Sequence, residues 1–210
     1  TPPADAGVFA NDFVAINKYC DRVRIMAYDQ QSIDLKLNAQ YASSSQLYAP
    51  VADPTWVEKT IVLAAKSISK KKLMIGIPTY GYEYDVTAYA GKEYLYDLLW
   101  SFNPGYATPI AAQYNVTPYR TPWGEMAFSY SPTATSALPA PQAGGMNGLA
   151  TALAATAFAD TYNSHLNFRY MVWPDAQSVA DKIALAKRLG VRGVSVFKLD
   201  GGQDPKVWSV

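Results

Sequence analysis

Residues 22–29, RVRIMAYD, form a short apolar run that ends in a tyrosine and an aspartate. Two comparable runs follow at 73–79, LMIGIPT, and at 191–197, VRGVSVF. In each run the apolar residues are nearly continuous rather than alternating, which is typical of strands buried on both faces. Strands of this kind belong to parallel sheets that are covered by helices, so the three runs predict an α/β fold.

Helical segments with clear ends precede the second and third runs. Asp53 is followed by Pro54, which gives an N-cap and a proline at the first helical position of a helix that we expect to reach about Ser69. Asp175 or Ser178 can cap a further helix that stops at Gly190. The order of helices and strands predicts parallel β/α units.

Residues 83–170 interrupt this alternation. They contain a possible helix at 93–100, strand-like pieces at 114–119 and 125–130, and an Ala-rich helix at about 149–161. The stretch occupies 88 of the 210 residues and leaves 122 for the β/α units. A closed eightfold barrel needs about 250 residues, so we expect these units to be too few to close a barrel alone.

Composition excludes several classes of function. Lys and Arg number 18 against 17 Asp and Glu, and a net charge of +1 gives no reason to expect nucleic acid. Cys20 is the single cysteine, so an intrachain disulfide is impossible and a metal site built on cysteine is not expected. We also expect no other metal site and no cofactor. No apolar run is long enough to span a membrane. The basic run at 70–72 is interpreted as the solvated end of the preceding helix.

Aromatic residues are abundant, with 16 Tyr, 5 Trp and 7 Phe. Weakly charged surfaces rich in aromatic rings suit the stacking of sugars, and tyrosine also fills strands and sheet edges. Both interpretations of this composition remain open.

Met26-Ala27-Tyr28-Asp29 resembles the Met-x-Tyr-Asp motif on the sixth barrel strand of glycoside hydrolase family 18. Residues 76–82, GIPTYGY, are similar to the seventh-strand motif of that family, and residues 171–200 to its closing helix and eighth strand. The pieces occur in the family's order. Tyr82 and the segments 124–130 and 173–178 look most like the branch of this chitinase-like family that contains bacterial spore-cortex and cell-wall N-acetylglucosaminidases.

The resemblance implies the C-terminal portion of a TIM (β/α)8 barrel, strands six to eight, with an α+β insertion domain. Residues 1–82 would form a barrel segment with strands six and seven. Residues 83–170 would form the insertion, which the family places between strands seven and eight. Residues 171–210 would add the last helix and strand.

The family's substrate-assisted retaining mechanism gives Tyr28 and Asp29 their expected roles. A Glu protonates the leaving oxygen while the N-acetyl carbonyl of the substrate attacks the anomeric carbon. By resemblance, Tyr28 would donate its hydroxyl to the acetamido oxygen, and Asp29 would help to orient that group. The alternative is that Tyr28 packs on a loop and Asp29 caps a turn.

Four further residues would line the sugar groove: Met26, Tyr80, Tyr82 and Phe197. The family often has Arg at the position of Tyr82 and usually Trp at the position of Phe197, so a charge-assisted contact and part of a stacking surface are absent here. The alternative for Tyr80 and Tyr82 is support of the insertion, and for Phe197 a place in the core.

The family's Asp-x-x-Asp-x-Asp-x-Glu motif, which carries the proton donor, is missing from the sequence. We therefore expect a part of a glycosidase that hydrolyses β-linked N-acetylglucosamine polymers, chitin or peptidoglycan, and we expect this chain alone to be inactive. The alternative is a non-catalytic carbohydrate-binding protein, a chitinase-like lectin.

The expected partners are an N-acetylglucosamine polysaccharide and either a missing N-terminal half of the barrel or a second copy of the chain. The resemblance implies an extracellular or cell-wall location. The sequence shows no signal peptide pattern, and its first residue, Thr1, suggests a processed or truncated N-terminus.

Overall fold

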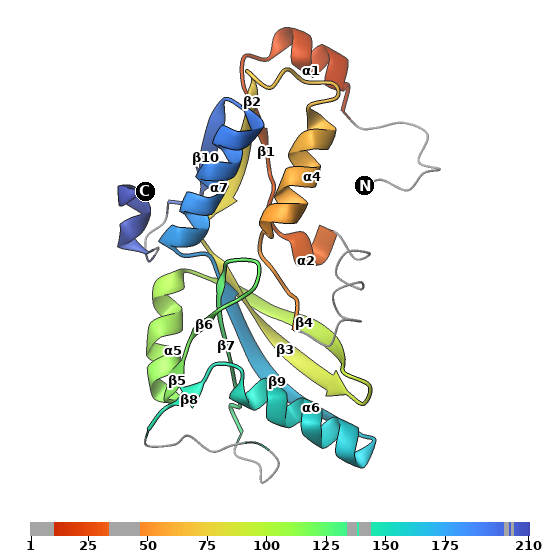
Figure 1. Ribbon diagram of the computed structural model, residues 1–210, viewed down its shortest axis with the longest axis vertical. Coiled ribbons are helices and arrows are strands. Elements are labelled where there is room, and N and C mark those ends of the chain that lie inside the picture. The colour runs from red at the N-terminus through yellow and green to blue at the C-terminus, as the bar shows by residue number, and fades with distance from the viewer. Residues whose placement is uncertain (1–10, 34–46, 134–137, 139–143, 200–201, 203) are drawn as a thin grey trace.

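A computed structural model describes residues 11–33, 47–133, 138, 144–199, 202 and 204–210 (Figure 1). The described residues form a mixed α/β fold with a three-stranded parallel sheet and a five-stranded antiparallel sheet. Figure 1 shows the parallel sheet in the upper half and the antiparallel sheet below it. Residues 1–10, 34–46, 134–137, 139–143, 200–201 and 203 lie outside this description.

The parallel sheet contains the three predicted strands in the order β1-β2-β10. β1 spans Val23–Ile25, β2 Leu73–Pro78 and β10 Gly193–Phe197. β2 lies in the centre, with Val23 opposite Leu73 on one side and Gly193 opposite Met74 on the other. The parallel arrangement confirms the predicted strands, although β1 is shorter than its run. The predicted burial on both faces is right only for β2, because every residue of β1 and β10 is at least partly exposed.

Two capped helices pack on this sheet, α4 (Pro54–Ala64) and α7 (Ala176–Leu189). The Asp53 carboxylate accepts a hydrogen bond from the Thr55 amide at 2.7 Å, and Asp175 and Ser178 form a reciprocal capping box. α7 ends at Gly190, whose φ of 67° suits glycine. Both predicted helix starts are confirmed.

α4 ends at Ala64 rather than near Ser69, so the interpretation of residues 70–72 as its charged end is wrong. The favourable effect of a cation on a helix end fades within the last turn.

Two short helices flank β1: α1 spans Phe13–Tyr19 and α2 spans Gln30–Ile33. α1 buries none of its residues, and the Lys72 ammonium donates to its Asn17 carbonyl at 2.5 Å.

The antiparallel sheet has the order β4-β3-β9-β7-β6. Its strands are β3 (Gly81–Tyr89), β4 (Glu93–Phe102), β6 (Tyr119–Arg120), β7 (Met126–Tyr130) and β9 (His165–Trp173). β3 and β9 are its long central strands and pair over eight residues.

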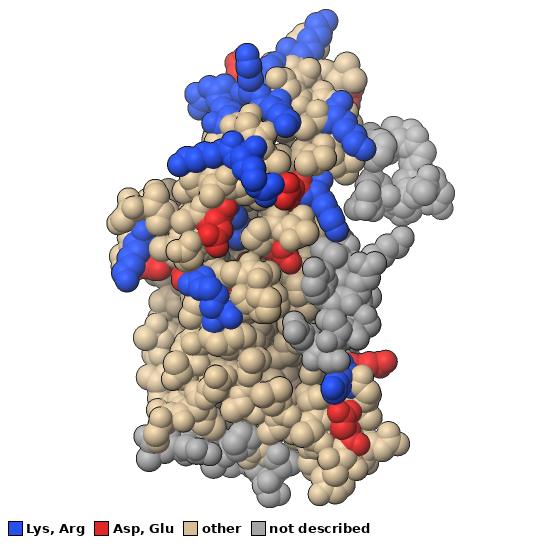
Figure 2. Space-filling view, in the orientation of Figure 1, with Lys and Arg blue, Asp and Glu red and all other residues tan. Residues whose placement is uncertain are grey.

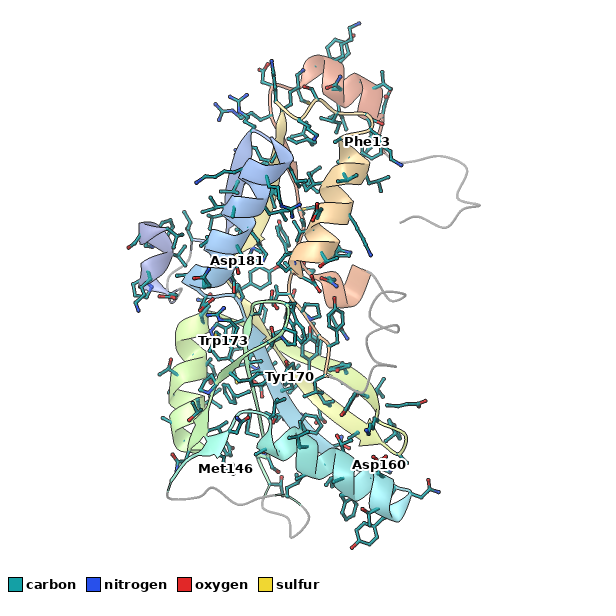
Figure 3. All side chains as sticks on the ribbon, viewed as in Figure 1. Phe13, Met146, Asp160, Tyr170, Trp173 and Asp181 are labelled. Carbon is teal, nitrogen blue, oxygen red and sulfur yellow. The ribbon has the colours of Figure 1, made fainter. Side chains whose placement is uncertain are left out.

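Helices cover both faces of this sheet. The predicted Ala-rich helix is confirmed as α6 (Ala150–Tyr162), which lies against β3, β7 and β9, and Asp160 near its end accepts from the Gly91 amide of the β3–β4 turn (Figure 3). The other face packs with α5 (Ala107–Gln113) and a two-stranded sheet of β5 (Val116–Thr117) and β8 (Met146–Asn147). Single-turn helices η1 (Pro104–Tyr106) and η2 (Pro205–Ser209) complete the described elements.

The predicted helix at 93–100 is wrong, because these residues form strand β4. A tight turn precedes the strand, with Gly91 at φ 82° and Lys92 at φ 61°, and it reverses the chain onto β3. Tyr94 and Tyr96 then alternate with exposed residues and pack on the core, as a half-buried strand requires.

The two sheets meet where β2 leads into β3 and where β9 leads into α7. A side chain at Gly81 would approach the Val172 carbonyl and the Trp173 side chain within about 2.6 Å, so this crossing needs a glycine. The predicted boundaries at 82/83 and 170/171 fall inside β3 and β9, which begin at Gly81 and end at Trp173. The division into barrel and insertion segments stays a prediction.

Candidate functional site

Aromatic side chains gather where the three parallel strands end. Tyr28, three residues after β1, is buried and its ring stacks on that of Phe197 at the end of β10, with centroids 5.3 Å apart and planes 9° apart. Tyr80, after β2, meets both rings edge-on at 6.2 and 6.0 Å. Offset-stacked and edge-on contacts are the favourable geometries for aromatic rings. The three strand ends are therefore joined by one ring cluster.

Gly76 in the middle of β2 makes room for this cluster. A Cβ at that position would lie 2.6 Å from the Ile25 carbonyl oxygen and 3.0 Å from the Tyr28 ring. The strand therefore needs a residue without a side chain for β1 and Tyr28 to lie this close to it.

Asp29 connects the cluster to the antiparallel sheet. The hydroxyls of Tyr80 and Tyr82 both donate to its Oδ1, the second at 2.5 Å. Burial raises the pKa of both tyrosines well above the ordinary value, and the hydrogen bonds to Asp29 raise it further. Both phenols therefore stay protonated and hold the carboxylate in one orientation.

The backbone of Asp29 adopts an uncommon left-handed conformation, with φ 62°. The next residue, Gln30, is fully buried, and its amide hydrogen-bonds the Tyr48 hydroxyl at 2.8 Å and the Asp53 amide at 2.9 Å. The Tyr48 hydroxyl in turn donates to the Asp53 carboxylate at 2.8 Å. A backbone conformation of this kind persists only where the surrounding structure fixes it. Here the buried hydrogen-bond network holds the residue after Asp29, and the ring cluster holds the Asp29 side chain.

The Tyr28 hydroxyl has a different role from those of its neighbours. It makes no hydrogen bond within the described residues, and its pKa is raised by burial and by the nearby Asp29 charge. It is therefore a protonated phenol whose donor is free for a ligand beside an oriented carboxylate. The exposed edge of the cluster is formed by Phe197, which is 48% exposed and can meet an apolar ring face.

Five of the six site residues predicted from the sequence come together here: Tyr28, Asp29, Tyr80, Tyr82 and Phe197. Met26 is the sixth; its side chain is 70% exposed, and it takes no part in the hydrogen bonds that orient Asp29. The roles of all six residues toward a substrate stay predictions.

The sequence analysis missed the inward continuation of this cluster. Contacts between rings run from Tyr82 to Tyr84 at 6.0 Å, then to Tyr96 at 5.8 Å and Tyr94 at 6.4 Å. The period-two spacing of tyrosines at 82–84 and 94–96 could have indicated it, had residues 93–100 been assigned to a strand.

Two further carboxylates are buried but already occupied. Glu125 is fully buried and accepts from the Val51 and Ala52 amides at 3.0 and 2.8 Å and from the Trp123 indole at 3.0 Å. Glu83 accepts from the Tyr130 hydroxyl at 2.6 Å and the Trp100 indole at 2.5 Å. These contacts give both groups a structural role, so neither is a candidate proton donor.

The described residues contain no group of three or more His, Cys, Asp and Glu side chains suited to hold a metal ion. Within the same residues, no helix combines the length and apolar character that crossing a bilayer requires. What the site offers is a stacking surface, one free phenol donor and one oriented carboxylate. This set can bind and orient a polar ring compound.

Solved structures share this fold. The spore cortex-lytic enzyme SleL of Bacillus cereus is similar with a TM-score of 0.61 and 18% identity, over 94% of this chain and 35% of SleL. A class V chitinase from Nicotiana tobaccum, solved in complex with NAG4, is similar with a TM-score of 0.51 and 14% identity, over 89% of this chain and 46% of that chain. This chain thus spans about a third of SleL and less than half of the chitinase.

Sequence comparisons agree with the fold. The uncharacterized glycosylase YvbX of Bacillus subtilis is 32% identical over 75 residues, which cover 36% of this chain and 19% of YvbX. Glycosyl hydrolases family 18 is matched by residues 1–202. The chain belongs to glycosyl hydrolases family 18.

Proposed function

We propose that this chain contributes the substrate-positioning part of a glycosidase that hydrolyses β-linked N-acetylglucosamine polymers. In this proposal β1, β2 and β10 are strands six to eight of a (β/α)8 barrel, and the antiparallel sheet with its helices is an α+β insertion between the last two. Active sites of such barrels lie at the carboxyl ends of the strands, where the ring cluster is. The tobacco chitinase, solved with NAG4, supports this class of ligand.

The observation that carries the proposal is the pairing of a free phenol with an oriented carboxylate. The Tyr28 hydroxyl has no partner within the described residues, and Asp29 next to it is held by Tyr80 and Tyr82. A neutral phenol is a hydrogen-bond donor of the kind that an acetamido oxygen needs. Phe197 supplies an exposed ring against which a sugar can stack.

In the proposed mechanism the substrate supplies its own nucleophile. The acetamido oxygen forms a bond to the anomeric carbon as the glycosidic bond breaks, and a Glu that this sequence does not contain protonates the leaving oxygen. Tyr28 donates to the acetamido oxygen, while Asp29 accepts from the acetamido N–H and favours the positive charge that develops there. Water then opens the cyclic intermediate, and the configuration at the anomeric carbon is retained.

The test uses a protein in which this chain is joined to the acidic motif. Tyr28→Phe removes one oriented donor and should lower kcat by about 10²–10³-fold while KM changes far less. Tyr162→Phe is the matched control, because Tyr162 lies on α6 and is 67% exposed, and it should leave both constants unchanged. Unchanged kinetics for Tyr28→Phe would reduce Tyr28 to a packing residue.

The 210-residue chain alone should not hydrolyse a chromogenic N-acetylglucosaminide. The loss of general acid catalysis removes about 10²–10⁴-fold in rate, and here the acid is missing from the sequence. Robust turnover by the purified chain would contradict the assignment of the acid to another segment.

A second candidate is a carbohydrate-binding protein without turnover, a chitinase-like lectin. The missing acidic motif and the smaller ring of Phe197 favour it. Under this hypothesis the chain binds the N-acetylglucosamine tetramer in calorimetry, and no segment of the whole protein carries the Asp-x-x-Asp-x-Asp-x-Glu motif. An intact motif encoded before Thr1 would decide for the enzyme.

We also propose an extracellular or cell-wall location, since chitin and peptidoglycan are both found there. Fractionation of the producing cells, with detection of this chain by antibody, tests that location. Titration with chitin fragments against peptidoglycan fragments separates the two candidate polymers.

A further inference from the structure

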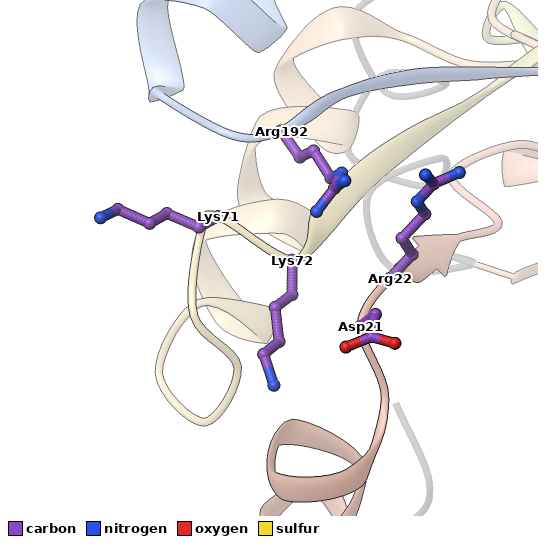
Figure 4. A pocket seen from close by; sticks show the side chains of 5 residues that line it. All are labelled: Asp21, Arg22, Lys71, Lys72 and Arg192. Carbon is purple, nitrogen blue, oxygen red and sulfur yellow. The ribbon is translucent and has the colours of Figure 1, made fainter.

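A pocket lies at the opposite end of the parallel sheet from the ring cluster. It has a volume of about 760 Å³, is open to solvent, and is lined by Asp21, Arg22, Lys71, Lys72 and Arg192 (Figure 4). Four of these five side chains are cations. The strand β2 separates the pocket from the ring cluster by its six residues, which span about 20 Å.

The topology brings these cations together from three distant parts of the sequence. Arg22, Lys72 and Arg192 each stand directly before one of the three parallel strands. The Val23 amide donates to the Lys72 carbonyl at 2.8 Å, and the Arg192 amide donates to the Leu73 carbonyl at 2.9 Å. Because the strands are parallel, their amino ends meet at one edge of the sheet.

Lys72 is fixed within the pocket, while the arginines are free to take a ligand. The Lys72 ammonium donates to the Asn17 carbonyl at 2.5 Å, and Figure 4 shows the Lys72 side chain reaching toward α1. In the same view Arg22 and Arg192 come from the two strands that flank β2, and their guanidinium groups extend toward each other, whereas Lys71 points away from both.

Cations outnumber carboxylates in the lining of the pocket by four to one. Arg22 and Arg192 are exposed, and neither belongs to an ion pair among the residues that the structure describes. Asp21 is the one carboxylate in the lining. Like charges held close together raise the free energy of the empty pocket, and a bound anion relieves that repulsion.

Charge is segregated around this pocket although the whole chain is nearly neutral. Ten of the 18 Lys and Arg residues fall within 11–24, 66–72 and 187–192, together with two acidic residues, Asp12 and Asp21. Figure 2 shows the basic side chains gathered over the upper end of the molecule. The net charge of +1, which gave no reason to expect nucleic acid, conceals this distribution.

We propose that this pocket binds a phosphate group, with Arg22 and Arg192 as its two principal ligands. Guanidinium groups match the oxygens of phosphate with paired hydrogen bonds, and two of them suit a group that can carry two negative charges. The surrounding lysines extend the favourable field beyond one group, which suits a polymer that carries phosphates at intervals. The site does not depend on the proposed glycosidase function.

The test is calorimetric titration of the 210-residue chain at constant ionic strength. Inorganic phosphate and linear polyphosphate are the two ligands, and sodium chloride is the blank. Arg22→Gln/Arg192→Gln should weaken binding about tenfold or more, because it removes both guanidinium groups. Lys59→Gln/Lys206→Gln removes the same charge from exposed positions outside the pocket and should change affinity less than about twofold.

Two alternative patterns of binding both support the proposal and separate the sources of the phosphate. Comparable binding of both ligands indicates a small phosphorylated compound, and binding of polyphosphate alone indicates a polymer. Arg22→Lys/Arg192→Lys keeps the charge, so weakened binding by this pair indicates recognition by the guanidinium geometry. Amide chemical-shift changes at residues 21–23, 71–73 and 192–193 of the unmodified chain check the location without any substitution.

The proposal is overturned if neither ligand binds with a Kd below about 1 mM. It is also overturned if the arginine pair and the control pair weaken binding equally, since that result means diffuse attraction to a basic surface.

Discussion

The two sheets differ in how completely the described residues cover them. In the antiparallel sheet, β3 and β9 are buried along most of their length, between α6 on one face and α5 on the other. In the parallel sheet β2 is almost wholly buried, but each residue of β1 and β10 is at least partly exposed. One sheet is enclosed by its own helices, and the other is enclosed only at its centre.

The two sheets therefore differ in the source of their stability. Purely parallel sheets are found almost only with both faces covered, and open edges invite pairing with another chain. The antiparallel sheet should therefore be stable by its own packing. The parallel sheet should gain stability from whatever covers β1 and β10, and pairing between two copies of the chain stays a prediction.

The largest effect is expected in the enclosed sheet. Phe168 on β9 is 1% exposed, so Phe168→Ala should lower the free energy of unfolding by about 3–5 kcal/mol. Urea unfolding followed by tryptophan fluorescence measures this. Leu153→Ala is the control, because Leu153 on α6 is 63% exposed, and it should change stability by no more than about 0.5 kcal/mol.

A slightly smaller effect is expected where the two regions join. Lys182 on α7 is fully buried near Glu125, which precedes β7, and its ammonium has no hydrogen-bond partner within the described residues. Lys182→Met leaves the Glu125 carboxylate buried without its nearby positive charge. At pH 7 this should lower the free energy of unfolding by about 3 kcal/mol.

The effect of Lys182→Met should depend on pH. Burial raises the pKa of Glu125, and loss of the ammonium raises it further. When folding raises the pKa of a carboxyl group, ionisation of that group destabilises the folded protein. The folded protein is therefore most stable below the pKa that the group has in the unfolded chain, and it loses stability as the pH rises through the pKa that the group has in the folded chain. The difference from the original chain should therefore be small at about pH 4 and grow toward pH 7. A difference independent of pH in thermal unfolding would contradict the charge argument.

A moderate effect is expected at the hydrogen bond that crosses between the sheets. Tyr82 on β3 donates to Asp29, which follows β1, at 2.5 Å. Tyr82→Phe removes this bond and should lower the free energy of unfolding by about 1.5–2 kcal/mol, as for other bonds to charged groups. Chemical denaturation measures the loss, and Tyr162→Phe should show none. Equal stability of the two variants would mean that the sheets are joined by apolar packing alone.

The smallest effect is expected in the open strand β10. Val194 is only partly buried, so Val194→Ala should lower the free energy of unfolding by about 1 kcal/mol or less in a monomer. Sedimentation and thermal unfolding over a range of protein concentrations distinguish the alternatives. If two copies pair through β10, the loss becomes larger and both association and Tm depend on concentration.

Segments with strong local patterns could be predicted from the sequence. The apolar runs predicted β1, β2 and β10, and the caps at Asp53 and Asp175 marked the starts of α4 and α7. In each case the deciding residues lie within one or two turns of the element that they define. The prediction failed for residues 93–100, because their apolar positions fit a helix as well as a strand. In the folded chain these residues form a strand because they pair with β3.

The candidate site was predictable in part for the same reason. Tyr28, Asp29, Tyr80 and Phe197 lie at or just after the carboxyl ends of the predicted parallel runs, so their convergence follows from topology. That Tyr82 turns its hydroxyl toward Asp29 depends on where β3 begins, and the gathering of Arg22 and Arg192 depends on the register of all three strands.

The sequence by itself determined the class of fold, the positions of the three parallel strands, the starts of α4 and α7 and the family, because these depend on residues that are close along the chain. Only the tertiary structure decided the strand β4, the reach of β9 to Trp173, the orientation of Asp29 and the segregation of charge. Each of these depends on contacts between residues separated by tens of positions. Their free energy comes from burial and hydrogen bonds that exist only once the chain has folded.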